Sequence, residues 1–409
     1  MSALSDNGYS LGNTKTLLLG LDDEALKLVG AADGLVPTLA EHADEVDRDG
    51  HVSADVFRKL VAAGFMRIFI PKRMGGFGQG MQTMLAVAAA LGRGCGSTAW
   101  VTMIVAGSNM MLNMFSGRAQ IDAWGKNVDV GACTAQGKEV TVEPVDGGYR
   151  VSGQWPYLSG VEHATWALVQ MLDTSIDPPN LLFGLVPVAA GTIEQTWNVA
   201  GMRGTASDTL VLKDYFVPSH HTCSFLDALA GNPASEFRDE PITRIPLGPA
   251  IELGLLGPPI GVVQAALEHV LKLAPNRKIT LSSYASQSAS TMFQVQVAEA
   301  AAKLEAARAL TVLMTKEVDS AAVENRKLEY VDHARIRATI GSAGAMLREA
   351  MQILTQAHGT STFAQANPLQ RMWRDVNVAT SHSMVTEGLG YEVYGKALVG
   401  SDERIVKIV

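Results

Sequence analysis

The sequence predicts a mainly α-helical protein with a β domain in the middle of the chain. Three observations lead to this fold class. Apolar residues recur at helical spacing early and late in the chain, short β-branched runs separated by turns fill the middle, and 409 residues are more than one hydrophobic core supports. The order of helices, strands and helices differs from the alternation of a doubly wound sheet. We therefore expect an N-terminal helical domain, a β-barrel or β-sandwich domain and a C-terminal four-helix bundle.

The first domain is expected over residues 15–128. Leu26, Val29 and Leu35 begin its helical periodicity, which a glycine-rich loop interrupts at residues 68–80. Residues 129–228 form the expected β domain. Its strand signals are the runs 139–142, 149–152 and 209–212, and its strands are expected to end at 217–221, before a connecting loop at 230–249. Helices at 251–273, 288–318, 328–357 and 370–398 then predict the bundle within residues 229–409.

Composition narrows the possible partners. Hydrophobic residues make up 47% of the chain and charged residues 18%, which suits a protein that buries much of its surface, partly between subunits. The net charge is −8 without a long basic run, so nucleic acid is not an expected partner. We see no signal peptide and no apolar run that we expect to span a membrane, so a cytoplasmic protein is the expectation.

Neither metal nor nicotinamide binding is expected. The cysteines Cys95, Cys133 and Cys223 are far apart, and His220 and His221 lack partners at ligand spacing, so we interpret 220–221 as a surface loop. The glycine clusters follow helical patterns and do not match the dinucleotide-binding fingerprint. In a redox enzyme, electrons would therefore arrive through a flavin that is reduced elsewhere.

Four phrases, in order along the chain, carry a family resemblance over residues 30 to 400: IPKRMGGFGQG, GMRGTASDTLVLKDYFVP, ARIRATIGSAG and RMWRDVNVATSH. They resemble the acyl-CoA dehydrogenase superfamily, whose fold has the predicted order of domains. The segment GQWPYLSGVEHATWAL (residues 153–168) resembles the two-component flavin-dependent monooxygenases known as group D aromatic hydroxylases. This resemblance implies that Ser159 contacts the flavin N5 edge, that Trp155 and Leu158 pack on the ring, and that Gly160 completes the segment. The alternative is an ordinary turn.

The C-terminal helix separates the two branches. In dehydrogenases that carry the catalytic glutamate here, the base lies about eight residues after the Arg-Asp pair. That position is Ser383 in this chain, and His382 precedes it, where the hydroxylase branch places a histidine beside flavin C4a. An imidazole can donate to the distal oxygen of a C4a-hydroperoxide, so His382 favours oxygen chemistry. Two alternatives stay open: His382 as an ordinary core histidine, and Glu387 as a displaced dehydrogenase base.

The resemblance also implies contacts to the flavin phosphates and to the substrate. The residues implied for the cofactor are Thr134, Arg203, Thr205, Ser207, Arg374 and Arg277. Arg277 lies where relatives send an arginine into a neighbouring subunit, which implies a homotetramer. Its alternative is a helix C-terminal charge.

The substrate residues implied are Trp100, Ser108 and Asn109. Several phenol hydroxylases carry a histidine in the stretch that holds Ser108 and Asn109, and its absence leaves room for an indole, a heteroatom nucleophile or a polycyclic ketone. Nearby methionines, Met103, Met110, Met111 and Met114, either line an apolar pocket or pack the helix.

The predicted function is that of an oxygenase component. It would take reduced FMN or FAD from a separate flavin reductase, react with O2 and hydroxylate a small aromatic substrate. An FAD-dependent acyl-CoA dehydrogenase and a non-catalytic assembly protein of the same fold are the alternatives.

Overall fold

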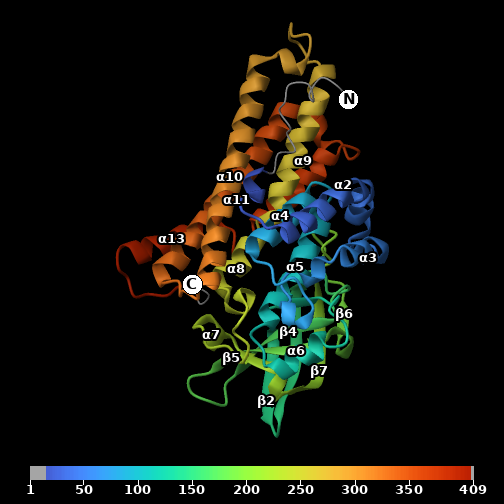
Figure 1. Cartoon of the computed structure of the whole chain (residues 1–409). Helices are drawn as coiled ribbons and strands as arrows, with labels where there is room; N and C mark the ends of the chain where they lie inside the picture. The colour runs from blue at the N-terminus through green and yellow to red at the C-terminus, as the bar shows by residue number, and fades with distance from the viewer. Residues whose placement is uncertain (1–14, 407–409) are drawn as a thin grey trace.

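The computed structural model describes residues 15–406. The long C-terminal helices and the two sheets occupy opposite ends of an elongated molecule (Figure 1). The N-terminal helices α2, α4 and α5 lie between the C-terminal helices and the strands. One hydrophobic core unites the N-terminal and C-terminal helices, and a second core lies inside the β domain.

The N-terminal helices begin and end where the sequence provides caps. Asp22 accepts the backbone N–H of Ala25 at 2.8 Å at the start of the second helix, and Gly50 ends that helix with φ 78°. All twelve residues of the fourth helix are buried, so it forms the centre of the helical core. The helices are α1 (Lys15–Leu18), α2 (Asp23–Asp49), α3 (Ala54–Ala62), α4 (Met81–Gly92), α5 (Gly96–Leu112) and α6 (Gly117–Trp124).

The β domain consists of two four-stranded sheets, with strand orders β1-β4-β5-β8 and β2-β3-β7-β6. The pair β1 and β4 is parallel and the other pairs are antiparallel. Strands were expected to end by residue 221, but a further short strand follows because residues 222–224 pair with β5. The strands are β1 (Ala132–Ala135), β2 (Lys138–Val145), β3 (Gly148–Leu158), β4 (Trp166–Asp173), β5 (Asn180–Pro187), β6 (Thr192–Glu194), β7 (Asp208–Pro218) and β8 (Thr222–Ser224).

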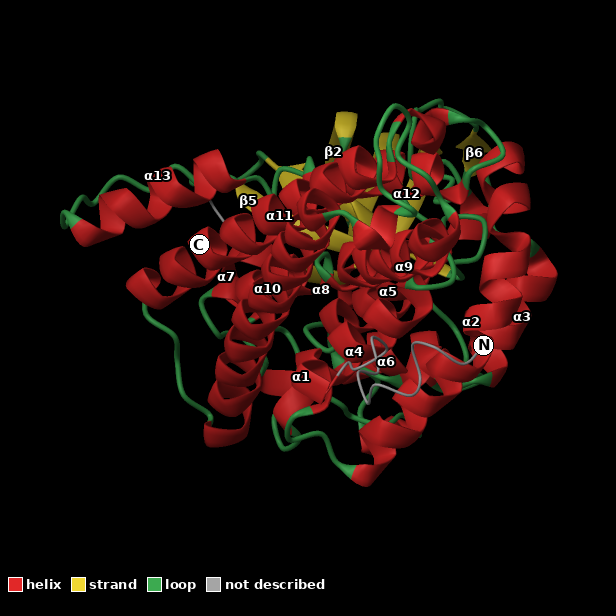
Figure 2. Ribbon diagram, turned by 90° about the horizontal axis from the view of Figure 1, so that it is seen from above, coloured by secondary structure: helices red, strands yellow, loops and turns green. Residues whose placement is uncertain are grey.

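The C-terminal region is helical, with two differences from the expected helices. The expected helix at 251–273 is divided between α8 and α9. The last expected helix is interrupted at residues 381–386, so His382 lies in a turn. The helices are α7 (Phe225–Leu229), α8 (Leu247–Gly254), α9 (Gly257–Leu273), α10 (Thr291–Glu324), α11 (Tyr330–His358), α12 (Pro368–Thr380) and α13 (Glu387–Leu398). Helix α13 projects sideways from the bundle (Figures 1 and 2).

One described segment is long and apolar enough to cross a membrane by length and composition alone. It is Leu247–Asn276, and 94% of its most apolar window is buried inside the fold. This differs from the expectation that no run would qualify, because α8 and α9 follow one another almost without interruption. Its burial is that of a core helix.

Candidate functional site

Trp100 connects the two residues expected to carry the chemistry. Its indole Nε1–H donates to Ser159 Oγ at 3.2 Å, and its ring centroid lies 6.0 Å from that of His382. Ser159 comes from the turn after β3, Trp100 from α5 and His382 from the turn after α12. Three segments that are distant in the sequence therefore meet at one indole ring.

The hydroxyl of Ser159 belongs to a directed chain of hydrogen bonds. Thr205 Oγ1 donates to the Met202 carbonyl at 2.9 Å, so it accepts from Ser207 Oγ at 2.7 Å. Ser207 Oγ in turn accepts from Ser159 Oγ at 2.7 Å. Ser159 donates its proton to Ser207 and accepts a hydrogen bond from Trp100. One lone pair of its oxygen therefore remains free as an acceptor. It can therefore accept a hydrogen bond from a ligand N–H.

Glycine at position 160 allows the turn to approach α5. Gly160 has φ +71°, and a Cβ there would lie 2.7 Å from the Val105 side chain. Its backbone N–H donates to the Thr205 carbonyl at 2.9 Å. Any larger residue would be strained and would push the neighbouring Ser159 away from the indole.

Backbone strain gathers around the same hydroxyl chain. Tyr157, Met202 and Ala206 all have positive φ, at 64°, 54° and 40°. The Met202 N–H donates to Asp375 Oδ1 of α12 at 2.6 Å. Burial raises the pKa of Asp375 to about 6. A buried carboxyl group from the C-terminal helices thus fixes the loop that ends the hydroxyl chain, as is common where strained backbone serves a site.

His382 presents one free ring nitrogen. Its Nδ1 accepts the backbone N–H of Met384 at 3.3 Å, so the neutral ring carries its proton on Nε2. Among the residues that the structure describes, no side chain or carbonyl is hydrogen-bonded to that Nε2. Burial lowers the pKa of His382, and the charge of Arg337 lowers it further. The imidazole is therefore a neutral N–H donor near pH 7.

A buried ion pair lies behind the His382 turn. Arg337 of α11 pairs with Glu252 of α8, and both side chains are less than 5% exposed. The same guanidinium donates to the Ser383 carbonyl at 3.1 Å. Burial raises the pKa of Glu252 to about 8, although the guanidinium opposes this shift. The pair anchors the turn and places a positive charge near His382.

Comparisons with known proteins agree with this arrangement. The acyl-CoA dehydrogenase N-terminal domain matches residues 30–128, and the acyl-CoA dehydrogenase C-terminal domain matches residues 253–387. A flavin-dependent monooxygenase oxygenase subunit, HsaA, from Rhodococcus jostii is 30% identical over 90% of this chain and 97% of its own length. The oxygenase component of an FADH2-dependent resorcinol hydroxylase from Rhizobium is 31% identical over 93% of this chain and 95% of its own length.

This chain belongs to the acyl-CoA dehydrogenase superfamily. Within that superfamily it belongs to the flavin-dependent monooxygenases, as its relatives do. Among solved structures, XiaF from Streptomyces in complex with FADH2 and glycerol has a TM-score of 0.88 at 30% identity, covering 97% of this chain and 99% of its own. The 3-HSA hydroxylase from Rhodococcus has a TM-score of 0.87 at 26% identity, covering 94% of this chain and 99% of its own.

In this monooxygenase, the other residues expected around the flavin ring lie inside the β domain. Trp155 and Leu158 are fully buried in the β core. The Trp155 indole donates to the Gln170 carbonyl at 3.0 Å, and Thr134 Oγ1 donates to the Leu168 carbonyl at 3.2 Å. The structure therefore brings Ser159, Thr205 and Ser207 together, and gives Trp155, Leu158 and Thr134 contacts within the sheets.

The three arginines expected at flavin phosphates also contact protein groups. Arg374 pairs with Asp47 at 2.6 Å, and Arg203 Nε donates to the Asp47 carbonyl at 2.7 Å. Arg203 thus ties the end of α2 to the loop before β7, and Arg374 ties it to α12. Arg277 donates to Ser361 Oγ at 2.7 Å and follows α9, which ends at the end of the bundle away from the β domain (Figure 1). It is remote from Ser159 of the same chain.

The two polar residues expected to contact the substrate, Ser108 and Asn109, form hydrogen bonds to other groups of the protein. Asn109 is completely buried, donates to the Met66 and Val130 carbonyls, and accepts from Trp124 Nε1. With both amide hydrogens and its oxygen used, it holds the first domain together. Ser108 donates back to the Ile104 carbonyl at 2.9 Å within α5.

The methionines of α5, with Met114 just after it, all pack in the helical core, and two of the four also line a cavity. Met110 and Met114 line a cavity of about 260 Å³, together with residues of the 228–247 segment and of the loop before α11. Met103 and Met111 are buried in the helical core. This cavity lies about 15 Å along α5 from Trp100, at the rise of an α-helix, so it is separate from the Trp100 site.

Glu387 does not provide a dehydrogenase base. Its carboxylate pairs with Arg348 at 2.7 Å at the start of α13. A backbone hydrogen bond at its own N–H and the Arg348 guanidinium lower its pKa. A carboxylate stabilised in this way is a weaker base. Glu387 is therefore poorly suited to act as the base of a dehydrogenase.

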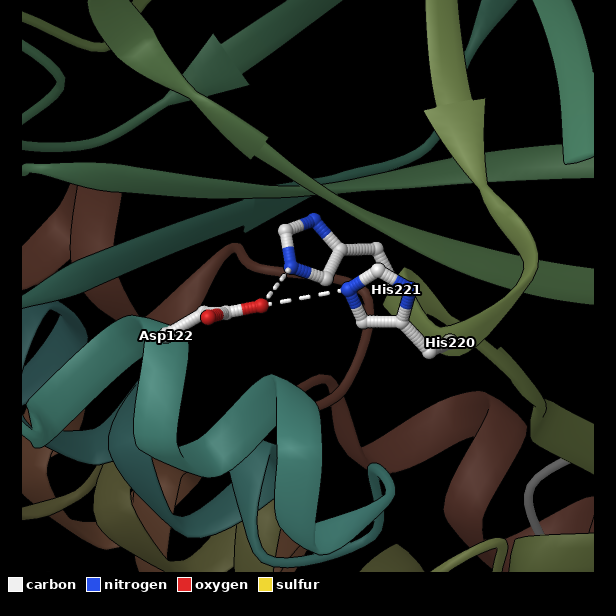
Figure 3. Close-up of side chains that lie close together, drawn as sticks. All are labelled: Asp122, His220 and His221. Atoms are coloured by element: carbon white, nitrogen blue, oxygen red, sulfur yellow. Dashed lines mark hydrogen bonds and ion pairs between the residues drawn. The ribbon is translucent and has the colours of Figure 1, made fainter.

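The expectation for His220 and His221 needs a correction. Both Nε2 atoms lie close to Asp122 Oδ2, at 3.1 and 3.0 Å (Figure 3). Asp122 comes from α6, 98 residues earlier in the chain, so spacing along the sequence gave no sign of this partner.

Several residues of the Trp100 site were not anticipated. Arg337, Glu252 and Asp375 act through buried contacts between distant elements, for which local periodicity carries no signal. Two further residues, Ile104 and Gly107, are the positions of α5 that are not fully buried. They lie four and seven residues after Trp100, on the same side of the helix. From the sequence, incomplete burial of this apolar helix could have been suspected only at Gly107, because glycine has no side chain to fill the space beside it.

Proposed function

We propose that this chain is the oxygenase component of a two-component monooxygenase that hydroxylates a small aromatic substrate. Reduced FMN or FAD would come from a separate flavin reductase, and O2 would supply the inserted oxygen. The full-length match to relatives named as oxygenase components supports this proposal. The flavins named with structural neighbours, FADH2 and FMN, support either form of the cofactor.

One observation carries the proposal: a free acceptor and a free donor both lie beside Trp100. Ser159 offers its remaining lone pair, which suits the N5–H of a reduced flavin. His382 offers its Nε2 proton. A bound reduced flavin would supply the electrons that activate O2.

The chain's own groups then have defined tasks. Ser159 orients the ring by accepting a hydrogen bond, and the buried Trp100 indole keeps water from the same volume. His382 passes its Nε2 proton to the reacting oxygen while its Nδ1 takes up another from solvent or substrate, so the ring stays neutral. The lowered pKa of His382 keeps the ring neutral before this step, with its proton on Nε2.

The side of α5 that carries Trp100 supports an aromatic substrate. Ile104 and Gly107 continue this side and are partly open. A Cβ added at Gly107 would meet only the Met103 sulfur at 3.8 Å, so there is space at this position. An apolar, partly open helix side beside His382 suits a flat aromatic ring.

A homotetramer is part of the proposal. Arg277 is remote from its own Ser159 and lies at the end of the bundle, where a neighbouring chain can reach it. In a tetramer it would meet the flavin phosphate of another subunit, for which the planar guanidinium is suited.

Oxygen-18 labelling tests the function directly. The purified chain is combined with NADH, a flavin reductase, FMN or FAD, and a panel of phenols and indoles under oxygen-18 gas. We expect one labelled oxygen atom in a hydroxylated product, formed only when this chain is present. Formation of hydrogen peroxide alone with every substrate and both flavins would contradict the proposal.

A further inference from the structure

Asp122, His220 and His221 form a cluster whose residues have no part in the Trp100 site. All three ligand atoms, Asp122 Oδ2 and the two Nε2 atoms, lie within 4.8 Å of one another. Figure 3 shows both imidazole rings pointing from the η4 turn (Ser219–His221) towards the carboxylate of α6. We refer to these three residues as the His-His-Asp cluster.

We propose that the His-His-Asp cluster binds a divalent transition-metal ion such as Zn²⁺. Two imidazole nitrogens and one carboxylate oxygen are the ligand types that such ions prefer over Mg²⁺ or Ca²⁺. The inference does not depend on the proposed function.

The distances between the ligand atoms suit such an ion. Each Nε2 atom lies 3.0 to 3.1 Å from the same Oδ2. Bonds of about 2.0 to 2.1 Å at angles between octahedral and tetrahedral values place neighbouring ligand atoms about 2.9 to 3.4 Å apart. Both nitrogen–oxygen distances therefore already suit one shared ion, and the two nitrogens lie within 4.8 Å of each other.

The two histidines are held in an arrangement that a simple ion pair does not require. A single histidine would be enough to neutralise Asp122, yet adjacent residues direct both Nε2 atoms at one oxygen. Their ring centroids are 4.4 Å apart because the η4 turn brings consecutive side chains to the same side. The His221 ring also packs edge-on against Trp166 at 6.0 Å, which fixes its orientation.

The backbone around the cluster is fixed independently of the ligands. Ser116, the N-cap of α6, donates to the His220 carbonyl at 3.0 Å. The Ser219 N–H donates to the Gly147 carbonyl at 2.8 Å. Helix α6 and the η4 turn are thus joined before any ion binds, so the cost of ordering the ligands is small.

The cluster is also open to solvent. The side chains of Asp122, His220 and His221 are 44%, 25% and 12% exposed. An ion can enter, and water can fill its remaining positions. A bound ion would clamp α6 of the N-terminal domain to the strand connection of the β domain, which predicts a stabilising rather than a catalytic role.

Calorimetric titration of the full, untagged and metal-free chain with Zn²⁺ tests the proposal. We expect one ion per chain, and Co²⁺ at the same site should give a visible absorption spectrum that Zn²⁺ abolishes. Saturating Zn²⁺ should raise the melting temperature, because an ion that binds only the folded state stabilises it. None of these three measurements requires flavin or enzyme activity.

Substitutions assign the ion to the cluster. His221→Gln and Asp122→Asn should each weaken Zn²⁺ binding at least about tenfold, as loss of one of three ligands predicts. His51→Gln, which alters an exposed histidine outside the cluster, is the matched control and should bind as the wild type does. Absence of binding by the wild type would show that the cluster is only a hydrogen-bonded contact. Equal binding by His221→Gln, Asp122→Asn and wild type would place the ion elsewhere, and either result overturns the proposal.

Discussion

The two regions that meet at Trp100, one around Ser159 and one around His382, are built differently. On the Ser159 side, hydroxyl groups of the β domain form a directed chain that ends at the Met202 carbonyl, and no group in this chain titrates near neutral pH. On the His382 side, a turn of the C-terminal helices presents a titratable ring, with a buried ion pair behind it. The difference indicates a division of labour: the β domain fixes geometry, and the helices control a proton.

The largest expected effect comes from the proton-transferring side. His382→Ala should lower the rate of product formation about 100-fold, within the range for loss of a general acid. Reduced flavin should still be oxidised by O2, so the yield of product per flavin oxidised should fall. The measurement is product by chromatography against NADH consumed. His382→Gln, which keeps an N–H donor but cannot pass on a proton, is the matched control for packing and should be impaired to a similar extent. An unchanged product yield in both variants would remove His382 from the chemistry.

On the fixed side, the backbone should matter more than any single hydroxyl. Gly160→Ala places a methyl group 2.7 Å from Val105 at φ +71°, so it should lower the free energy of unfolding by about 2 kcal/mol. Thermal or urea unfolding measures this change. Gly147→Ala is the control: Gly147 also has positive φ, at +79°, but no close contact. A loss for Gly160→Ala no greater than that of the control would show that the turn does not need the close approach to α5.

Arg337 of the buried ion pair should add to the lowering of the His382 pKa that burial causes. In the double variant Glu252→Gln with Arg337→Gln, the positive charge near His382 is lost, so the pKa of His382 should rise. NMR of the ring proton resonances measures it. Lys303→Gln with Glu349→Gln, which removes an exposed pair in the same bundle, should leave that pKa unchanged.

The same shift has a consequence for stability. Because folding lowers the pKa of His382, the unfolded chain binds the proton more readily, and this contribution to stability is present above about pH 6.5 and is lost as the pH falls. The double variant should lose less stability from this group on acidification. A wild-type stability curve that His382→Gln leaves unchanged below pH 6.5 would contradict this.

The smallest effect is expected at Glu387. Glu387→Gln breaks a partly exposed pair with Arg348, so unfolding should become easier by less than about 1 kcal/mol. Product formation should remain as in the wild type. Loss of activity comparable with that of His382→Ala would indicate that the Glu387 carboxylate is a catalytic base.

The sequence was sufficient for the order of helices, strands and helices, and it suggested Ser159 and His382, whose roles stay a prediction. Helical periodicity and alternating β-branched runs are local, and the motifs around these two residues are short. The connection through Trp100 was not predictable, because its indole reaches a serine 59 residues away. Asn109 was misjudged for a similar reason: a polar residue next to the site in sequence is turned to the interior, where carbonyls of other segments saturate it. Asp122 became visible only once α6 and the η4 turn were placed together.

Anaerobic binding of reduced flavin to Ser159→Ala and His382→Ala tests the division of labour most directly. Ser152→Ala, in the strand that precedes Ser159 but away from Trp100, serves as the control. Loss of one hydrogen-bond acceptor should weaken the affinity of Ser159→Ala about tenfold, whereas His382→Ala should bind as the wild type does. Unchanged binding by Ser159→Ala together with weakened binding by His382→Ala would contradict the assignment of the two sides.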